Sequence, residues 1–159
     1  MCICILFFYT LIDSIEITNQ EAIQEIVGYL NITKKTLKEL INRADEKGIA
    51  VGAFSVGNME MVMGAVAAAE ELNMPIILQI AECRLKNSPL ELMGPMMISA
   101  AKNSKVEIAV HLDHGTTLEC IGQALDLGFT SVMFDGSHLP FEENVRITAE
   151  TKKLASEYD

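Results

Sequence analysis

Short apolar runs alternate with amphipathic segments through most of the chain, and this alternation limits the folds open to it. The runs cover residues 49–56, 75–80, 106–111 and 130–134, at a spacing of roughly 25 to 31 residues. Strands that alternate with helices in this way predict a parallel α/β architecture. A doubly wound sheet and a TIM barrel both fit the pattern. A complete (β/α)8 barrel takes about 250 residues, so the chain supplies about half of one.

The segments between the apolar runs are predicted to be helices, from their apolar periodicity and from the cap residues at their ends. They cover residues 35–46, 59–72, 89–102 and 116–127, and a last helix starts at Pro140. Asn58 is expected to cap the second helix. Thr116 and Glu119 are expected to form a capping box at the start of the fourth. Each predicted strand is thus followed by a helix, as a β/α repeat requires.

The first 32 residues differ from the rest and are interpreted as an N-terminal extension of unknown role, followed by a barrel half over residues 33–159. The extension begins with the apolar run MCICILFFYTLI. This run is too short to cross a bilayer, and it lacks the basic residues that open a secretory signal. We therefore expect no membrane partner and a cytoplasmic location.

The formal net charge of −10 limits the partners that the chain can bind. Proteins that bind nucleic acid neutralise its phosphates with clustered Lys and Arg, so a nucleic-acid partner is not expected. A phosphorylated small molecule is compatible with this charge, because backbone N–H groups can hold a phosphate on an acidic protein.

The run HLDHG, residues 111–115, places two histidines and an aspartate at the end of the third predicted strand. In parallel α/β folds, ligands bind at this end of the strands. Imidazole is a common zinc ligand, so His114 is a candidate metal ligand, and Asp113 could exchange a proton with a substrate oxygen. The alternative, in which these are polar residues satisfied by hydrogen bonds at a strand end, is equally compatible with the pattern.

Other polar residues follow the remaining strands. Asp135 ends the fourth strand and is expected at the same rim, as a carboxylate that helps to position a metal or as the start of an Asx-type turn. Gly57 and Asn58 follow the first strand and could face a ligand or form only a turn and a cap. Gln79 and Glu82 lie near the end of the second strand and are interpreted as solvated loop residues.

Five runs of the sequence resemble class II fructose- or tagatose-bisphosphate aldolases. They are residues 50–54, 67–72, 75–79, 111–115 and 128–144. The resemblance covers roughly residue 36 to the C-terminus, and its last two runs are highly specific in this order and spacing. Because the family folds as a TIM barrel, the resemblance favours a partial barrel of about four β/α units.

The resemblance implies a zinc-dependent enzyme that reversibly cleaves a ketose 1,6-bisphosphate, fructose or tagatose, into dihydroxyacetone phosphate and glyceraldehyde 3-phosphate. It implies that Asp113 is the catalytic acid/base and that His114 is a ligand of the catalytic Zn²⁺, which would act as a Lewis acid on the ketone oxygen. It implies that Asp135 can bind a second or displaced divalent metal ion. A homo-oligomer is implied for the full-length protein.

The chain departs from the family pattern at Ser55, where the family often has Asn, and at Ala81, where it often has Ser. These positions usually lie near the substrate in the family, and Ser55 and Asn58 are the substrate-contact candidates here. The family's other two zinc histidines, its proton-abstracting glutamate and its glycine-rich phosphate loop come later than the matched region. We therefore expect the isolated chain to have little or no activity, because a catalytic zinc site uses three protein ligands.

Two other functions are compatible with the sequence. A half-barrel with exposed sheet edges could associate with itself or with another chain and act as a binding or structural protein. A different metal-dependent α/β enzyme, such as a hydrolase, could use Asp113, His114 and Asp135.

Overall fold

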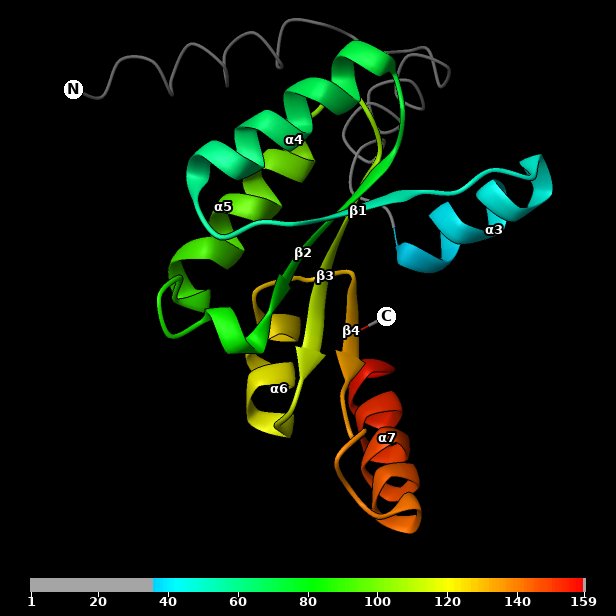
Figure 1. Cartoon of the computed structure of the whole chain (residues 1–159), viewed down its shortest axis with the longest axis vertical. Coiled ribbons are helices and arrows are strands. Elements are labelled where there is room, and N and C mark those ends of the chain that lie inside the picture. Colours follow the sequence, from blue (N-terminus) through cyan, green and yellow to red (C-terminus); the bar gives the residue numbers. More distant parts are fainter. Residues whose placement is uncertain (1–35, 159) are drawn as a thin grey trace, which may run out of the picture. The chain divides into compact units, whose positions relative to one another are not determined.

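The structure is a computed structural model that describes residues 36–158. The predicted N-terminal extension, residues 1–32, and its boundary lie outside this range. Four strands form one parallel sheet in the order β1-β2-β3-β4, as Figure 1 shows. Their bounds are Gly52–Ser55 for β1, Ile76–Ala81 for β2, Ile108–Gly115 for β3 and Ser131–Phe134 for β4.

Helices connect the strands and lie within about two residues of their predicted bounds. They are α3 (Leu37–Lys47), α4 (Met59–Leu72), α5 (Leu90–Asn103), α6 (Leu118–Asp126) and α7 (Phe141–Ala155), with a short 3-10 helix η1 (Glu82–Arg84) after β2. No helix within residues 36–158 combines the length and the apolar character needed to cross a membrane.

Two predicted helix caps had different outcomes. The side chain of Asn58 caps α4 as expected, because its amide oxygen accepts a hydrogen bond from the Met61 N–H at 2.9 Å. The predicted capping box of Thr116 and Glu119 is wrong. Thr117 is the cap of α6 and accepts a hydrogen bond from the Cys120 N–H at 3.2 Å, while the N–H of Thr116 is directed to Glu82.

One face of the sheet is covered by α4, α5 and α6 and forms the main core. Alternate residues of the two central strands point into it because successive side chains of a strand face opposite ways. The five central residues are completely buried: Leu78, Ile80, Ile108, Val110 and Leu112. Burying each such side chain stabilises the fold by roughly 1.5 to 3 kcal/mol before entropy costs are counted.

Helix α3 packs on the opposite face of the sheet, at the amino end of the strands (Figure 1). Leu40, 1% exposed, contacts Ile77 and Ala109, which are the second residues of β2 and β3. Because both contacts are near the start of their strands, α3 covers only the amino half of this face.

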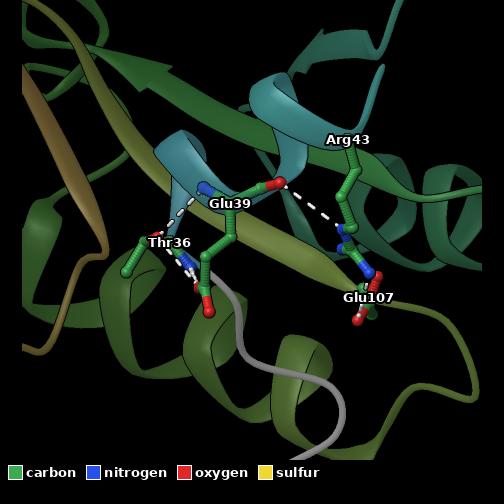
Figure 2. Close-up of polar contacts among 4 residues, drawn as sticks. All are labelled: Thr36, Glu39, Arg43 and Glu107. Atoms are coloured by element: carbon green, nitrogen blue, oxygen red, sulfur yellow. Dashed lines mark hydrogen bonds and ion pairs between the residues drawn. The ribbon is translucent and has the colours of Figure 1, made fainter. Parts of the chain in front are cut away.

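Polar contacts order the first turn of α3 and tie the body of the helix to the sheet (Figure 2). Thr36 and Glu39 form a capping box, in which the Thr36 N–H donates to the Glu39 carboxylate at 2.8 Å and the Glu39 N–H donates to the Thr36 hydroxyl at 3.2 Å. Arg43 forms a two-point ion pair with Glu107, whose first contact, from Nη1 to Oε1, measures 3.0 Å. Glu107 directly precedes β3, so the ion pair ties α3 to the base of the sheet.

The order of the strands decides between the doubly wound sheet and the TIM barrel, both of which fit the alternation of strands and helices. A doubly wound sheet reverses its strand order and carries connecting helices on both faces. Here the order is sequential, and the helices that connect the strands pack in one core on one face. Helix α3, on the other face, precedes β1 and connects no pair of strands. The described residues therefore form a partial TIM barrel of four β/α units.

Candidate active site

A row of polar side chains crosses the open face of the sheet at the carboxyl half of the strands. The strand register pairs Ser55 with Gln79, Gln79 with His111, and His111 with Ser131. These residues alternate with the buried core residues, so they share the face that α3 covers only at its amino half. Asp113 lies on the same face, one step further along β3.

Gln79 is the centre of this row and joins two strands to the predicted acid/base residue. Its amide Nε2 donates to the Ser55 hydroxyl at 3.0 Å and to Asp113 Oδ2 at 3.1 Å. The interpretation of Gln79 as a solvated loop residue is wrong, because it is a half-buried residue of β2. Its donated bond fixes the orientation of the Asp113 carboxylate and leaves Oδ1 available.

A β-bulge brings Asp113 and His114 to the same place. Leu112 pairs with Val132 and Gly115 pairs with Phe134, so two residues of β3 lie opposite Met133 alone. His114 takes the left-handed conformation, with φ of 46°. Neighbours in a regular strand would face opposite sides, but here Asp113 Oδ1 and His114 Nε2 lie 3.8 Å apart. The strand therefore runs beyond His111, its predicted end, and the bulge lies in the added part.

Gly115 allows β3 and β4 to approach closely just after this bulge. A Cβ at this position would lie 2.8 Å from the carbonyl oxygen of Met133, which is closer than a real carbon atom can come. The Gly115 carbonyl also accepts the Asp135 N–H at 2.7 Å. The absence of a side chain at Gly115 thus sets the spacing between the residues of the two strand ends.

Asp135 contacts His114 across the two strand ends. Its Oδ2 lies 2.6 Å from His114 Nδ1, and its Oδ1 accepts the Ser137 N–H at 3.0 Å. The second bond makes the Asx-type turn that the sequence allowed, so the turn and the rim carboxylate occur together. The hydrogen bond to Asp135, and then the charge of Asp113, raise the pKa of His114. Hydrogen bonds from His114 and Ser137 hold the pKa of Asp135 well below its usual range.

His111 has a separate environment on the same strand. Its Nδ1 lies 2.9 Å from the Ser131 hydroxyl, and its side chain is half-buried. Burial lowers the pKa of His111, because the charged form loses solvation. This lowering is larger than the rise in the pKa that the negative charge of Asp113 causes. His111 is therefore a neutral hydrogen-bonding residue of the polar row at neutral pH.

The donor set fits one part of a zinc site. His114 uses Nδ1 for Asp135, which leaves Nε2 as the ring atom for a metal, and a carboxylate on the other nitrogen is the usual support for a zinc histidine. Within residues 36–158 no three His, Cys, Asp or Glu side chains are grouped so that they could hold a metal. These residues can supply one imidazole ligand, and a complete site needs further ligands from elsewhere.

The two candidate substrate-contact residues, Ser55 and Asn58, differ in how they are connected to this site. Ser55 is exposed and is joined to Asp113 through Gln79. Asn58 uses its amide oxygen to cap α4. The metal role of Asp135 and the substrate roles of Ser55 and Asn58 stay predictions.

Comparison with known proteins places this geometry in a family. Residues 35–159 match the family model described as fructose-bisphosphate aldolase class-II. The chain is 45% identical over 121 residues to a fructose-bisphosphate aldolase of Giardia intestinalis, covering 76% of the chain and 38% of the relative. It is 43% identical over 116 residues to that of Thermus caldophilus, covering 73% and 37%.

A solved structure agrees with these relatives. The crystal structure of the YdjI aldolase from Escherichia coli K12 superposes with a TM-score of 0.71 at 36% identity, over 74% of the chain and 46% of that protein. The chain thus spans less than half the length of these relatives. The matched residues 35–159 span the positions of the polar row, the bulge and the Asp135 turn, and the chain belongs to the class II fructose-bisphosphate aldolase family.

Proposed function

We propose that the chain supplies the acid/base residue and one metal ligand for the reversible aldol cleavage of a phosphorylated ketose. The observation that carries the proposal is the convergence of Asp113, His114 and Asp135 at one rim of the sheet. In this arrangement His114 Nε2 lies beside Asp113 Oδ1. A metal held by the nitrogen and a proton acceptor at the oxygen could then act on adjacent atoms of one substrate.

Each residue has a defined task in this proposal. Asp135 orients the imidazole of His114, whose Nε2 would hold Zn²⁺; a bound Zn²⁺ would supply Lewis-acid polarisation of the ketone. Asp113 accepts the proton of the hydroxyl next to the breaking carbon–carbon bond and returns it in the condensation direction. Gln79 holds Asp113 Oδ2 so that Oδ1 stays directed toward the metal ligand.

The substrate in this proposal is fructose or tagatose 1,6-bisphosphate, and the products are dihydroxyacetone phosphate and glyceraldehyde 3-phosphate. Ser55 and Asn58 are its contact candidates at the rims of β1 and α4. Further β/α units contribute the other zinc ligands and the phosphate site, in a cytoplasmic homo-oligomer. The chain without such units is expected to have little or no activity, because one imidazole does not hold a catalytic zinc.

The test is to complete the barrel. The full chain is co-expressed with the C-terminal portion of the Giardia intestinalis relative, which lies beyond the matched region, and cleavage of fructose 1,6-bisphosphate is measured with and without Zn²⁺. Activity is expected only from the mixture and should disappear with a chelator. Asp113→Asn should abolish it, whereas Asp126→Asn, a matched change on α6, should not. Activity that survives Asp113→Asn would exclude the proposed acid/base role.

A second candidate function follows from the edges of the sheet. Every residue of β1 is exposed, including Phe54 at 47%, so this edge is open to association with a second half-barrel. Such a chain would be a binding or structural protein. Light scattering tests it directly, since a stable monomer at all concentrations excludes self-association. A metal-dependent hydrolase would use the same three residues, but the family membership favours aldol chemistry.

A further inference from the structure

Glu82 connects the end of β2 to the two residues that follow the bulge. It is the first residue of η1, and its Oε1 accepts a hydrogen bond from the Thr117 hydroxyl at 3.2 Å. Its Oε2 accepts the N–H of Thr116. The interpretation of Glu82 as a solvated loop residue is therefore wrong. One partly buried carboxylate binds the backbone and a side chain of a segment that begins two residues after His114.

This segment needs an anchor because the bulge is strained. A non-glycine residue in the left-handed conformation of His114, with φ of 46°, is strained, and it persists only where neighbouring contacts hold it. On one side, the Asp135 N–H binds the Gly115 carbonyl at 2.7 Å. On the other side, Glu82 holds Thr116 and Thr117. Gly115 is thus fixed between β4 and η1.

The Thr117 hydroxyl links this anchor to α6. It donates to Glu82 and accepts from the Cys120 N–H at 3.2 Å, so the carboxylate orients the same hydroxyl that caps the helix. Glu82 is close enough to Cys120 to help burial raise the pKa of that thiol to about 11. The carboxylate, the cap and the bulge therefore form one connected unit.

We propose that Glu82 is a positioning residue for the candidate active site: by holding Thr116 and Thr117, it maintains the bulge that turns Asp113 and His114 to the same side. The inference rests on the proposed function for its consequence, since the bulge sets the distance between the acid/base oxygen and the metal-binding nitrogen. Glu82 contacts neither residue itself, so it acts through the backbone of Gly115 and Thr116.

Three variants of the full chain separate this role from a general effect on stability. Glu82→Ala removes both contacts, whereas Glu82→Gln keeps an amide oxygen that can accept the Thr116 N–H. Glu119→Ala is the control, because it removes a carboxylate from the first turn of the same helix, α6. If Glu82→Ala does not fold, Glu82→Asp replaces it, since it keeps the charge but withdraws the carboxylate by one methylene.

The readout is the NMR spectrum of the His114 ring nitrogens, recorded without metal and then during a titration with Zn²⁺ alone. Because a single imidazole binds Zn²⁺ only weakly, the metal-free spectrum is the deciding measurement: Glu82→Ala should move the Nδ1 signal away from its hydrogen-bonded position. The Zn²⁺ concentration at half-shift, already high in wild type, should rise further. The His114 ring-nitrogen signals of Glu82→Gln should stay near those of wild type, and those of Glu119→Ala should be the same as wild type. Unfolding in urea is measured in parallel, because a purely structural role changes only that midpoint.

Unchanged His114 signals in folded Glu82→Ala, or in Glu82→Asp, would overturn the inference. Failure of the inference can be told apart from failure of the proposed function. If wild type shows no Zn²⁺ shift but Glu82→Ala still moves the metal-free Nδ1 signal, the positioning role stands and the metal role of His114 fails.

Discussion

The two faces of the sheet are formed by the same strands, but one contributes stability and the other carries the candidate active site. Leu112 and Asp113 are consecutive residues of β3, yet Leu112 is completely buried in the core and Asp113 belongs to the polar row of the open face. The helix-covered face provides the hydrophobic burial that stabilises the fold, while the carboxyl half of the open face carries the candidate chemistry. Stability and function are thus divided by side-chain direction, so mutations on the two faces should have separable effects.

The largest effect is expected in the core. Leu112→Ala should lower the free energy of unfolding by about 2 to 5 kcal/mol, because it removes buried apolar contacts and leaves a cavity. Asp113→Asn, the next residue, should cost less than about 1 kcal/mol, because its contacts are polar and partly exposed. Urea unfolding followed by circular dichroism measures both. Equal losses at the two positions would contradict the division between the faces.

The amino half of the open face should behave like a small core. Leu40→Ala is expected to cost about 2 to 3 kcal/mol, since Leu40 is 1% exposed against Ile77 and Ala109. Ile41→Ala, at a neighbouring position that is 49% exposed, is the matched control and should cost under about 1 kcal/mol. A similar unfolding midpoint for the two variants would show that α3 contributes little to the fold.

The ion pair between Arg43 and Glu107 should contribute less to the free energy of unfolding than the burial of Leu40 does. Arg43 is 44% exposed, so Arg43→Gln is expected to cost only about 0.2 to 1 kcal/mol. A double-mutant cycle with Glu107→Gln isolates the interaction, and 1 M salt should remove most of it. A coupling energy that is insensitive to salt would mean that the pair is effectively buried.

The smallest effect is expected at the active-site rim, and it should depend on pH. The raised pKa of His114 gives stability that is fully present below its ordinary value of 6.5 and is lost as the pH rises through the raised value. The lowered pKa of Asp135 gives stability that is present above 3.8 and is lost as the pH falls toward the lowered value. The midpoint difference between wild type and Asp135→Asn should therefore be greatest between pH 3.8 and 6.5. A difference that grows above pH 8 would have the wrong sign.

The sequence predicted the parts of the molecule that local patterns encode. Apolar periodicity located the strands and helices, and the strand ends correctly brought Asp113, His114 and Asp135 to one rim. The local pattern left the order of the sheet open, and the resemblance to aldolases favoured the sequential order of a barrel, which the structure confirms. The bulge was not predicted, because a two-against-one pairing has no local signature. Gln79 and Glu82 were misassigned because each is positioned by a hydrogen-bond partner 34 residues away in the sequence.

The sequential order of the strands also has a consequence for how the polypeptide is made. Each strand pairs with the next one in the chain, so hydrogen bonding within the sheet does not wait for a distant segment. A ribosome can therefore release one β/α unit after another onto a growing sheet, with the amino-terminal units assembled first. The Asp113–His114 bulge is then completed only when β4 emerges, because β4 supplies the strand against which the bulge forms.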